Sequence, residues 1–326
     1  MVFQRKVHIS VYWLLLFTGF FVFSVIGCAP RTGAVQKDVE DKEGGRLRVV
    51  ATTNIVGDVV GEVGGAWIDL TVLLPPGSNP HAYQPAPRDM SAVSEADVIF
   101  ANGLKLETFL EDILASAGGE AKVVIVSEGV EVRVFNEKHE EGEGTADHDL
   151  KNPDPHVWFD PRNVIIWTEN IESALAALDP AHSGTYRRRS DAYREQLREL
   201  DEWIADQVAK IPEENRELVT DHTAFGYFAN RYGFEQVGAV VPAPTTEAQP
   251  SGKQLAQLEE KIQAYDVQAI FVGRDFDPAL SARVAEDTGV QLVPLHFGSL
   301  TPPDGEAPTY LTYMRENVRA IVKALR

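Results

Sequence analysis

Four histidines stand where the chain is expected to turn or where a strand is expected to end. His81 lies in PPGSNPHAYQPAPRDM, whose five prolines predict a rigid surface loop, and His156 lies between prolines in PDPHVWFDP. His222 ends a predicted strand in LVTDHTAFGYF, and His296 follows another in VQLVPLHFGSL. Each histidine alone is more often structural than a ligand. Together they could face one cleft, and several imidazoles suit a transition metal such as zinc, copper, iron or nickel.

The other histidines point less clearly to chemistry. His8 lies near the N-terminus, and His182 lies at the start of a predicted helix, where a solvated role is expected. His139 and His148 share an acidic stretch, residues 135–154, which we interpret as a surface loop. A solvated insertion without a role is an equally good interpretation of this loop.

Motifs typical of enzymes are absent from the sequence. It contains no HExxH helix, no GxSxG elbow, no GxGxxG turn and no GxxxxGK followed by Ser or Thr. A hydrolytic zinc site stays open, because three histidines with Asp221 or Asp160 as base could suffice if one coordination position were free. Nothing in the sequence positively favours this hydrolase.

The composition is that of a globular protein with an acidic charge. Its 326 residues allow two domains with separate cores, and 44% hydrophobic with 24% charged residues is ordinary for this class. The net charge of -19 argues against nucleic acid and against binding to anionic membranes through protein charge. It is compatible with a cation as the ligand.

Residues 1–28 have the layout of an export signal. A basic start precedes the uncharged apolar run VYWLLLFTGFFVFSVIG, which ends at Cys28. VIGC resembles a lipobox, in which the cysteine is lipidated and becomes the mature N-terminus; a single transmembrane anchor is the alternative. Cys28 is the only cysteine, so no internal disulfide can form. Residues 29–46 are polar, and we expect a flexible tether there.

Strand-like and helix-like segments alternate along the rest of the chain, which predicts parallel sheets covered by helices. One such region spans residues 47–180 and another spans residues 212–326. Between them, residues 181–211 predict one amphipathic helix of roughly eight turns. Its apolar stripe consists of Tyr186, Tyr193, Leu197, Leu200, Ile204, Val208 and Ile211. We therefore expect two doubly wound α/β lobes, a long linking helix, and a site in the interlobe cleft beyond the strand ends.

Several motifs follow one another in the order of a known family. This chain resembles the zinc and manganese solute-binding lipoproteins of ABC transporters, the ZnuA- and TroA-like proteins, in PPGSNPHAYQPAPRDM, DPHVWFDPRN, VTDHTAFGYFANRYG, TTEAQPSGKQLAQL and APTYLTYMRENVRAIVKAL. The resemblance covers roughly residues 46–326. It implies a rigid linking helix, one divalent metal between the lobes, and an ABC permease with its ATPase as partner.

The resemblance also implies metal ligands. Carried over motif by motif, they fall on His81, His156 and His222. Manganese-binding members often have Glu at the third position, so His222 favours zinc, which suits nitrogen ligands. The acidic loop with His139 and His148 is similar, in short form, to the His-rich loop of zinc-type members.

The fourth ligand departs from the family pattern. Where many members carry Asp in a segment like LYSDSL, this chain has LHFGSL with Gly298. Because side chains alternate along a strand, His296 would face the same side as position 298, and we predict His296 as the fourth ligand. Asp275, at another strand end, and water are the alternatives.

The function expected from these features is binding without catalysis. We predict an exported, lipid-anchored monomer that captures Zn²⁺ and delivers it to the permease. A manganese-specific protein of the same family, a zinc-dependent surface hydrolase and an adhesin are the alternatives. Because imidazoles must be neutral to bind a metal, zinc affinity is expected to fall between about pH 7 and about pH 5.

Overall fold

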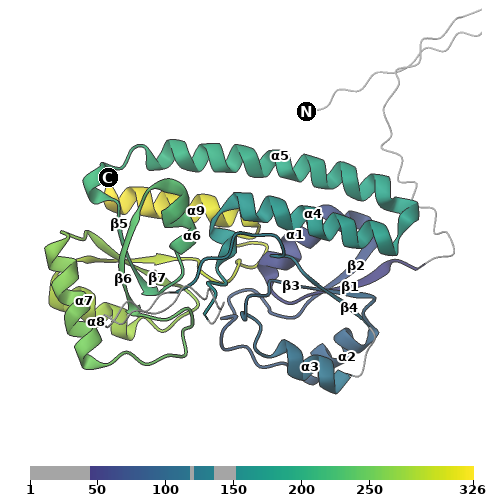
Figure 1. Ribbon diagram of the computed structural model, residues 1–326, viewed down its shortest axis with the longest axis horizontal. Helices are drawn as coiled ribbons and strands as arrows, with labels where there is room; N and C mark the ends of the chain where they lie inside the picture. The colour runs from purple at the N-terminus through teal and green to yellow at the C-terminus, as the bar shows by residue number, and fades with distance from the viewer. Residues whose placement is uncertain (1–44, 118–120, 136–151) are drawn as a thin grey trace, which may run out of the picture. The chain divides into compact units, whose positions relative to one another are not determined.

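Two four-stranded parallel sheets lie side by side in the folded part of the chain (Figure 1). The computed structural model describes residues 45–117, 121–135 and 152–326, and Gly45–Arg326 forms one compact unit. The first sheet has the strand order β2-β1-β3-β4, and the second has the order β6-β5-β7-β8. The predicted α/β fold with two parallel-sheet lobes is confirmed.

Helices cover both faces of the first sheet, which consists of β1 (Leu47–Ala51), β2 (Ile68–Val72), β3 (Val98–Ala101) and β4 (Lys122–Ile125). α1 (Asn54–Gly64) packs in one core cluster with Val49 and Ala51, and the short η1 (Gly65–Trp67) follows it. α2 (Pro87–Glu95) and α3 (Leu110–Ala117) share the other cluster with Val50 and Ile99. Successive strand residues point to opposite faces, so apolar residues at consecutive positions require helices on both faces.

The second sheet repeats this arrangement with β5 (Glu217–His222), β6 (Glu235–Val241), β7 (Ala269–Gly273) and β8 (Gln291–Leu295). α7 (Gly252–Ala264) and α8 (Ala279–Thr288) pack with Val219 and Ile270. α6 (Gly226–Tyr232) and α9 (Tyr310–Leu325) pack with Leu218 and Phe271 on the opposite face of this sheet. These side chains belong to the same core cluster as Val49 and Ala51. The sheet is therefore buried on both faces.

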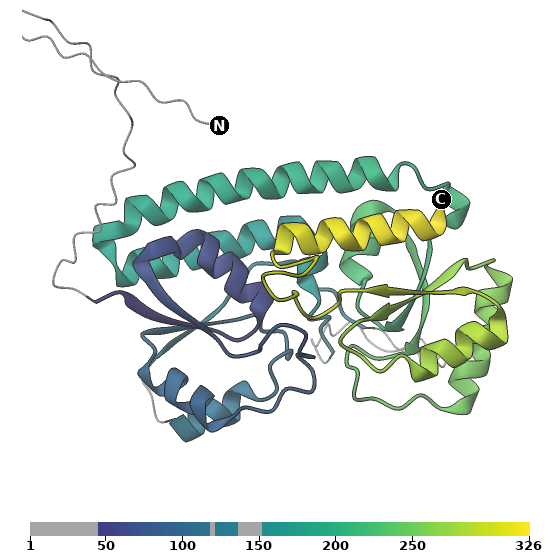
Figure 2. The same cartoon turned by 180° about the vertical axis from the view of Figure 1, so that it is seen from behind.

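Two long helices pack against each other, and one of them connects the halves. α4 (Pro161–Leu178) follows the short η2 (Val157–Phe159), and α5 (Ser183–Val208) runs along both halves from η3 (Pro180–His182) to η4 (Glu213–Asn215) (Figures 1 and 2). α5 packs against α1 and α4 in one half and against α9 in the other. Its predicted apolar stripe is buried.

The ends of α5 differ slightly from the helix predicted over residues 181–211. Residues 180–182 form a 3-10 turn that begins with Pro180, and α5 itself starts at Ser183. The helix ends at Val208, four residues before Pro212, and the proline disfavours helical backbone at Ile211.

Among the described residues, we find no helix that is long and apolar enough to cross a membrane. The predicted export signal with Cys28 and nearly all of the predicted tether lie outside the described residues, as do His139 and His148.

Candidate metal centre

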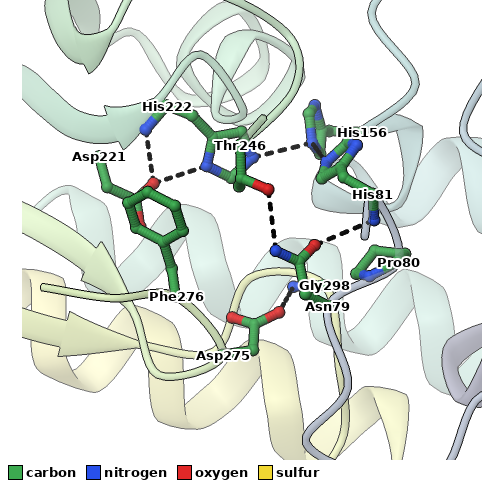
Figure 3. A pocket seen from close by; sticks show the side chains of 10 residues that line it. All are labelled: Asn79, Pro80, His81, His156, Asp221, His222, Thr246, Asp275, Phe276 and Gly298. Carbon is green, nitrogen blue, oxygen red and sulfur yellow. Dashed lines mark hydrogen bonds and ion pairs between the residues drawn. The ribbon is translucent and has the colours of Figure 1, made fainter. Parts of the chain in front are cut away.

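Three of the four predicted histidines meet at one point. The Nε2 atom of His156 lies 3.2 Å from Nε2 of His81 and 3.2 Å from Nε2 of His222 (Figure 3). The three residues are 9%, 1% and 3% exposed for His81, His156 and His222. Among the described residues, they form the one group of at least three His, Cys, Asp or Glu residues whose ligand atoms lie within 4.8 Å of one another.

Each histidine reaches this point from a different part of the fold. His81 lies in the proline-rich loop that follows β2, and its backbone N–H donates to Asn79 Oδ1 over 2.9 Å. His156 directly precedes η2, and His222 is the last residue of β5. Ligands from both sheets therefore meet, as expected for a site beyond the carboxyl ends of parallel strands.

The segment that carries His156 is held from both halves. Asn102 Nδ2, just beyond β3, donates to Pro155 O over 3.1 Å. Tyr227 Oη of α6 donates to Asp154 O over 3.1 Å. These two hydrogen bonds fix the backbone directly before the ligand, so little order has to be gained there when an ion binds.

Two buried carboxylates orient the imidazoles. Asp154 Oδ1 lies 2.8 Å from His156 Nδ1, and Asp221 Oδ1 lies 2.6 Å from His222 Nδ1. A carboxylate accepts a hydrogen bond from Nδ1–H, so we assign the proton to Nδ1 and the lone pair to Nε2 in both rings. The two Nε2 lone pairs then face each other over 3.2 Å without a proton between them. That arrangement suits a cation placed between the rings, since ligating histidines commonly use the other nitrogen in this way.

Burial keeps two of the imidazoles, those of His81 and His156, in the form that binds metal. It lowers the pKa of His81 and of His156 well below the usual 6.5, and the neighbouring imidazoles lower both further. Burial also raises the pKa of the Asp154 carboxyl to about 7. The neutral imidazole is the ligand form, so two of the three rings are ready to coordinate at neutral pH.

The cavity between the rings is small. The space open to the centre of a water-sized atom is about 10 Å³, which is room for about one water or ion. Its lining includes residues from both halves: Asn79, Pro80, His81, His156, Asp221, His222, Thr246, Asp275, Phe276 and Gly298 (Figure 3). A cavity of this size has no room for an organic substrate.

His296, the predicted fourth ligand, lies outside this cluster. Its backbone N–H donates to Asn317 Oδ1 over 2.8 Å, and its carbonyl accepts from Asn317 Nδ2 over 2.6 Å. It lines a separate surface hollow with Arg274 and Glu316. The prediction assumed that strand alternation continues to position 298. β8 ends at Leu295, so the chain has already left the sheet at His296.

Besides Asp221, a second carboxylate lies at the cavity, that of Asp275, two residues beyond β7. Its Oδ2 accepts from the Gly298 N–H over 3.3 Å. A Cβ atom at position 298 would lie 3.1 Å from that oxygen and 2.5 Å from Pro80 Cδ. Gly298 therefore leaves the space that Asp275 and Pro80 occupy, and an aspartate there would require both to move.

The other residues considered from the sequence have structural roles. Asp221 accepts at both oxygens, from His222 and from the Gly273 N–H over 2.6 Å, so it orients a ligand and holds the end of β7. Asp160 caps α4 by accepting from the Arg162 N–H over 2.9 Å and does not line the cavity. The His182 ring stacks on Trp67 with 3.8 Å between ring centroids.

Sequence inspection missed Asp154, Asn79 and Thr246. A local pattern could have indicated Asp154, because it lies between two prolines in PDPH, two residues before the ligand His156. Asn79 and Thr246 are 167 residues apart, and no local pattern indicates that their side chains meet.

Comparisons with known proteins identify relatives of this chain. The family model described as "Zinc-uptake complex component A periplasmic" (ZnuA) matches residues 49–324. The chain is 34% identical to the manganese-binding lipoprotein MntA of Halalkalibacterium halodurans, over 88% of this chain and 90% of that one. It is 32% identical to the manganese ABC transporter substrate-binding lipoprotein PsaA of Streptococcus mitis, over 86% and 90% of the two chains.

Solved structures show the same fold. The manganese-bound periplasmic metal-binding protein of candidatus liberibacter asiaticus superposes with a TM-score of 0.75 at 26% identity, over 86% of this chain and all of that one. The periplasmic zinc-binding protein TroA of Treponema pallidum gives 0.75 at 28% identity, over 86% and 99%. Three converging imidazoles, this fold and these relatives together show that the chain belongs to the ZnuA/TroA family of extracytoplasmic metal-binding proteins that serve ABC transporters.

Proposed function

We propose that this protein captures one divalent transition-metal ion with His81, His156 and His222 and passes it to an ABC permease with its ATPase. The observation that carries the proposal is the convergence of three buried Nε2 atoms on one point. Two of the rings are oriented by carboxylates, and the cavity admits about one ion. Such a preorganised set of donors lowers the ordering cost of binding.

Binding without turnover is part of the proposal. A zinc hydrolase needs an open coordination position, room for its substrate and a reachable base. The cavity is too small for a substrate, and both oxygens of Asp221 are engaged. We therefore expect no hydrolysis of ester or peptide substrates by the metal-loaded protein.

Zinc is the metal that the donor set favours. Imidazole nitrogens suit Zn²⁺, whereas oxygen-rich sets suit Mn²⁺, and affinity at a given site rises from manganese to zinc. Manganese is the second candidate, because several relatives are named as manganese-binding lipoproteins. The zinc preference therefore rests mainly on the three imidazoles.

A competition titration of the metal-free protein tests the function and the metal together. We expect one ion per chain and tighter binding of zinc than of manganese by orders of magnitude. Uptake of either metal by a strain that lacks this protein should be restored by the natural chain. It should not be restored by His156→Ala, although both forms are exported. Absence of binding for both metals would refute the proposal, and a preference for manganese would refute its zinc part.

We propose Asp275 as the fourth donor once an ion is bound, since it is the partly exposed carboxylate at the cavity. Asp275→Asn should lower zinc affinity by about tenfold, because it removes the negative charge and keeps the shape. His296→Ala is the matched comparison and should leave the affinity unchanged. Isothermal titration of the two variants decides between these residues, and the opposite order of effects would restore His296 as the ligand.

Attachment of Cys28 to a lipid is proposed from VIGC and from relatives named as lipoproteins. We expect the mature protein to begin at a modified Cys28 and to act as a monomer. Mass spectrometry of protein isolated from membranes checks the anchor, and an unmodified N-terminus elsewhere would contradict it.

A further inference from the structure

One side chain at the cavity links a metal ligand to the opposite half of the fold. Asn79 belongs to the loop after β2, which also carries His81. Its Oδ1 accepts from the His81 backbone N–H over 2.9 Å. Its Nδ2 donates to Thr246 Oγ1 over 2.8 Å, and Thr246 lies in the loop after β6 of the second sheet (Figure 3). A single amide thus braces the ligand loop and joins the two halves.

The same loop is tied to the second half at a second point, where the Gly77 N–H donates to Ser299 Oγ over 2.7 Å, and further hydrogen bonds between the halves lie deeper. Asn54 Nδ2 of α1 donates to Ser299 Oγ over 2.8 Å, and Asn54 Oδ1 accepts from the Leu300 N–H over 2.8 Å. All three residues are buried, whereas Asn79 and Thr246 are half-buried. Water can compete for the Asn79–Thr246 hydrogen bond without disturbing the core, so this contact can break while the deeper contacts persist.

The Asn79–Thr246 hydrogen bond lies where it can affect the release of an ion from the cavity. His81 comes from the first half and His222 from the second, so an ion held by both ties the halves together. To release the ion, the loop with His81 has to move away from the second half. The Asn79–Thr246 hydrogen bond joins that loop to the second half directly, and both residues line the cavity.

We propose that Asn79 and Thr246 form a latch, which keeps the ligand loop against the second half and slows the release of the bound metal. The inference rests on the proposed function, since it assumes that the three histidines hold an ion. Neither residue has to touch the metal. Asn79 and Thr246 are positioning residues that act on the dissociation rate through the loop of His81.

The test is the rate at which zinc leaves the full-length protein. Zinc-loaded protein is mixed with excess chelator in a stopped-flow instrument, and zinc transfer is followed by absorbance. Thr246→Val keeps the shape and removes the hydroxyl, so we expect release to be about three- to tenfold faster, with association little changed. Thr246→Ser keeps the hydroxyl and should stay within about twofold of the natural chain.

Thr245→Val is the matched control. Thr245 neighbours the latch, and its hydroxyl accepts from the Glu247 N–H over 3.3 Å without lining the cavity. Its release rate and the melting temperature of its metal-free form should equal those of the natural chain. If Thr245→Val released zinc as fast as Thr246→Val, the effect would belong to the loop in general and the latch would be refuted.

A double substitution isolates the hydrogen bond itself. In an Asn79→Ala background the bond is already absent, so adding Thr246→Val should accelerate release no further. A full additional effect would show that Thr246 acts without Asn79 and would overturn the inference. If Asn79→Ala fails to fold, the comparison of Thr246→Val with Thr246→Ser decides alone. No zinc binding by the natural chain would refute the proposed function, whereas equal release by Thr246→Val would refute only the latch.

Discussion

Replacing His156 by Ala is expected to lower metal affinity by more than about a hundredfold. Its Nε2 lies 3.2 Å from both other ligand atoms, so it is the shared neighbour of the cluster. Mutation of a carboxylate that orients a ligand typically lowers metal affinity by about 10- to 100-fold. Loss of the ligand itself should lower it further. His81→Ala and His222→Ala should each cost at least about tenfold. Isothermal titration with zinc measures all three.

His182→Ala is the control for these substitutions. The His182 ring stacks on Trp67 at the start of α5 and does not line the cavity, so its loss should leave zinc affinity unchanged. Circular dichroism of every variant checks that the fold is retained. If folded His156→Ala bound zinc within threefold of the natural chain, His156 could not be a ligand.

Acidification is expected to weaken metal binding by roughly tenfold for each pH unit below 7. Burial raises the pKa of Asp154 to about 7 and also raises that of Asp275. In the metal-free protein Asp154 therefore takes up a proton as the pH falls through 7. The ion is bound by the form in which Asp154 is ionised and accepts from His156 Nδ1–H. Low pH thus favours the metal-free state. Because binding releases one proton, the metal affinity falls by about tenfold for each pH unit.

The imidazoles contribute to this loss only at lower pH. Because the pKa of His81 and that of His156 lie well below 6.5, protons compete for these two ligands later than the sequence predicts. Asp154→Asn keeps an acceptor for His156 Nδ1–H and cannot ionise. Between pH 7 and 5.5, zinc binding by this variant should release about one proton fewer than binding by the natural chain. Its zinc affinity should therefore fall less steeply as the pH is lowered. Titrations at pH 7.5, 6.5 and 5.5 compare the two slopes, and equal slopes would exclude Asp154 as the titrating group.

Much of the fold could be predicted because it depends on local patterns. Alternating strand-like and helix-like segments gave both parallel sheets, and the apolar spacing from Tyr186 to Val208 indicated α5. His81, His156 and His222 stood at strand ends or in proline-stiffened turns, where parallel sheets collect their ligands.

The parts that could not be predicted depend on contacts between distant residues. His296 lies outside the cluster because alternation holds only within a strand, and the sequence does not mark the end of β8 at Leu295. Asp275 reaches the cavity because Gly298, from another strand end, leaves it room. The hydrogen bond between Asn79 and Thr246 joins loops from different sheets, which no periodicity links.

A crystal structure of the zinc-loaded protein, with data collected on both sides of the zinc absorption edge, tests the central claim most directly. We expect one anomalous peak per chain, about 2.0–2.1 Å from Nε2 of His81, His156 and His222, as is usual for zinc bound to imidazole. A peak at any other place, or a zinc-soaked site without a peak between these three rings, would contradict the assignment of this cluster as the metal centre.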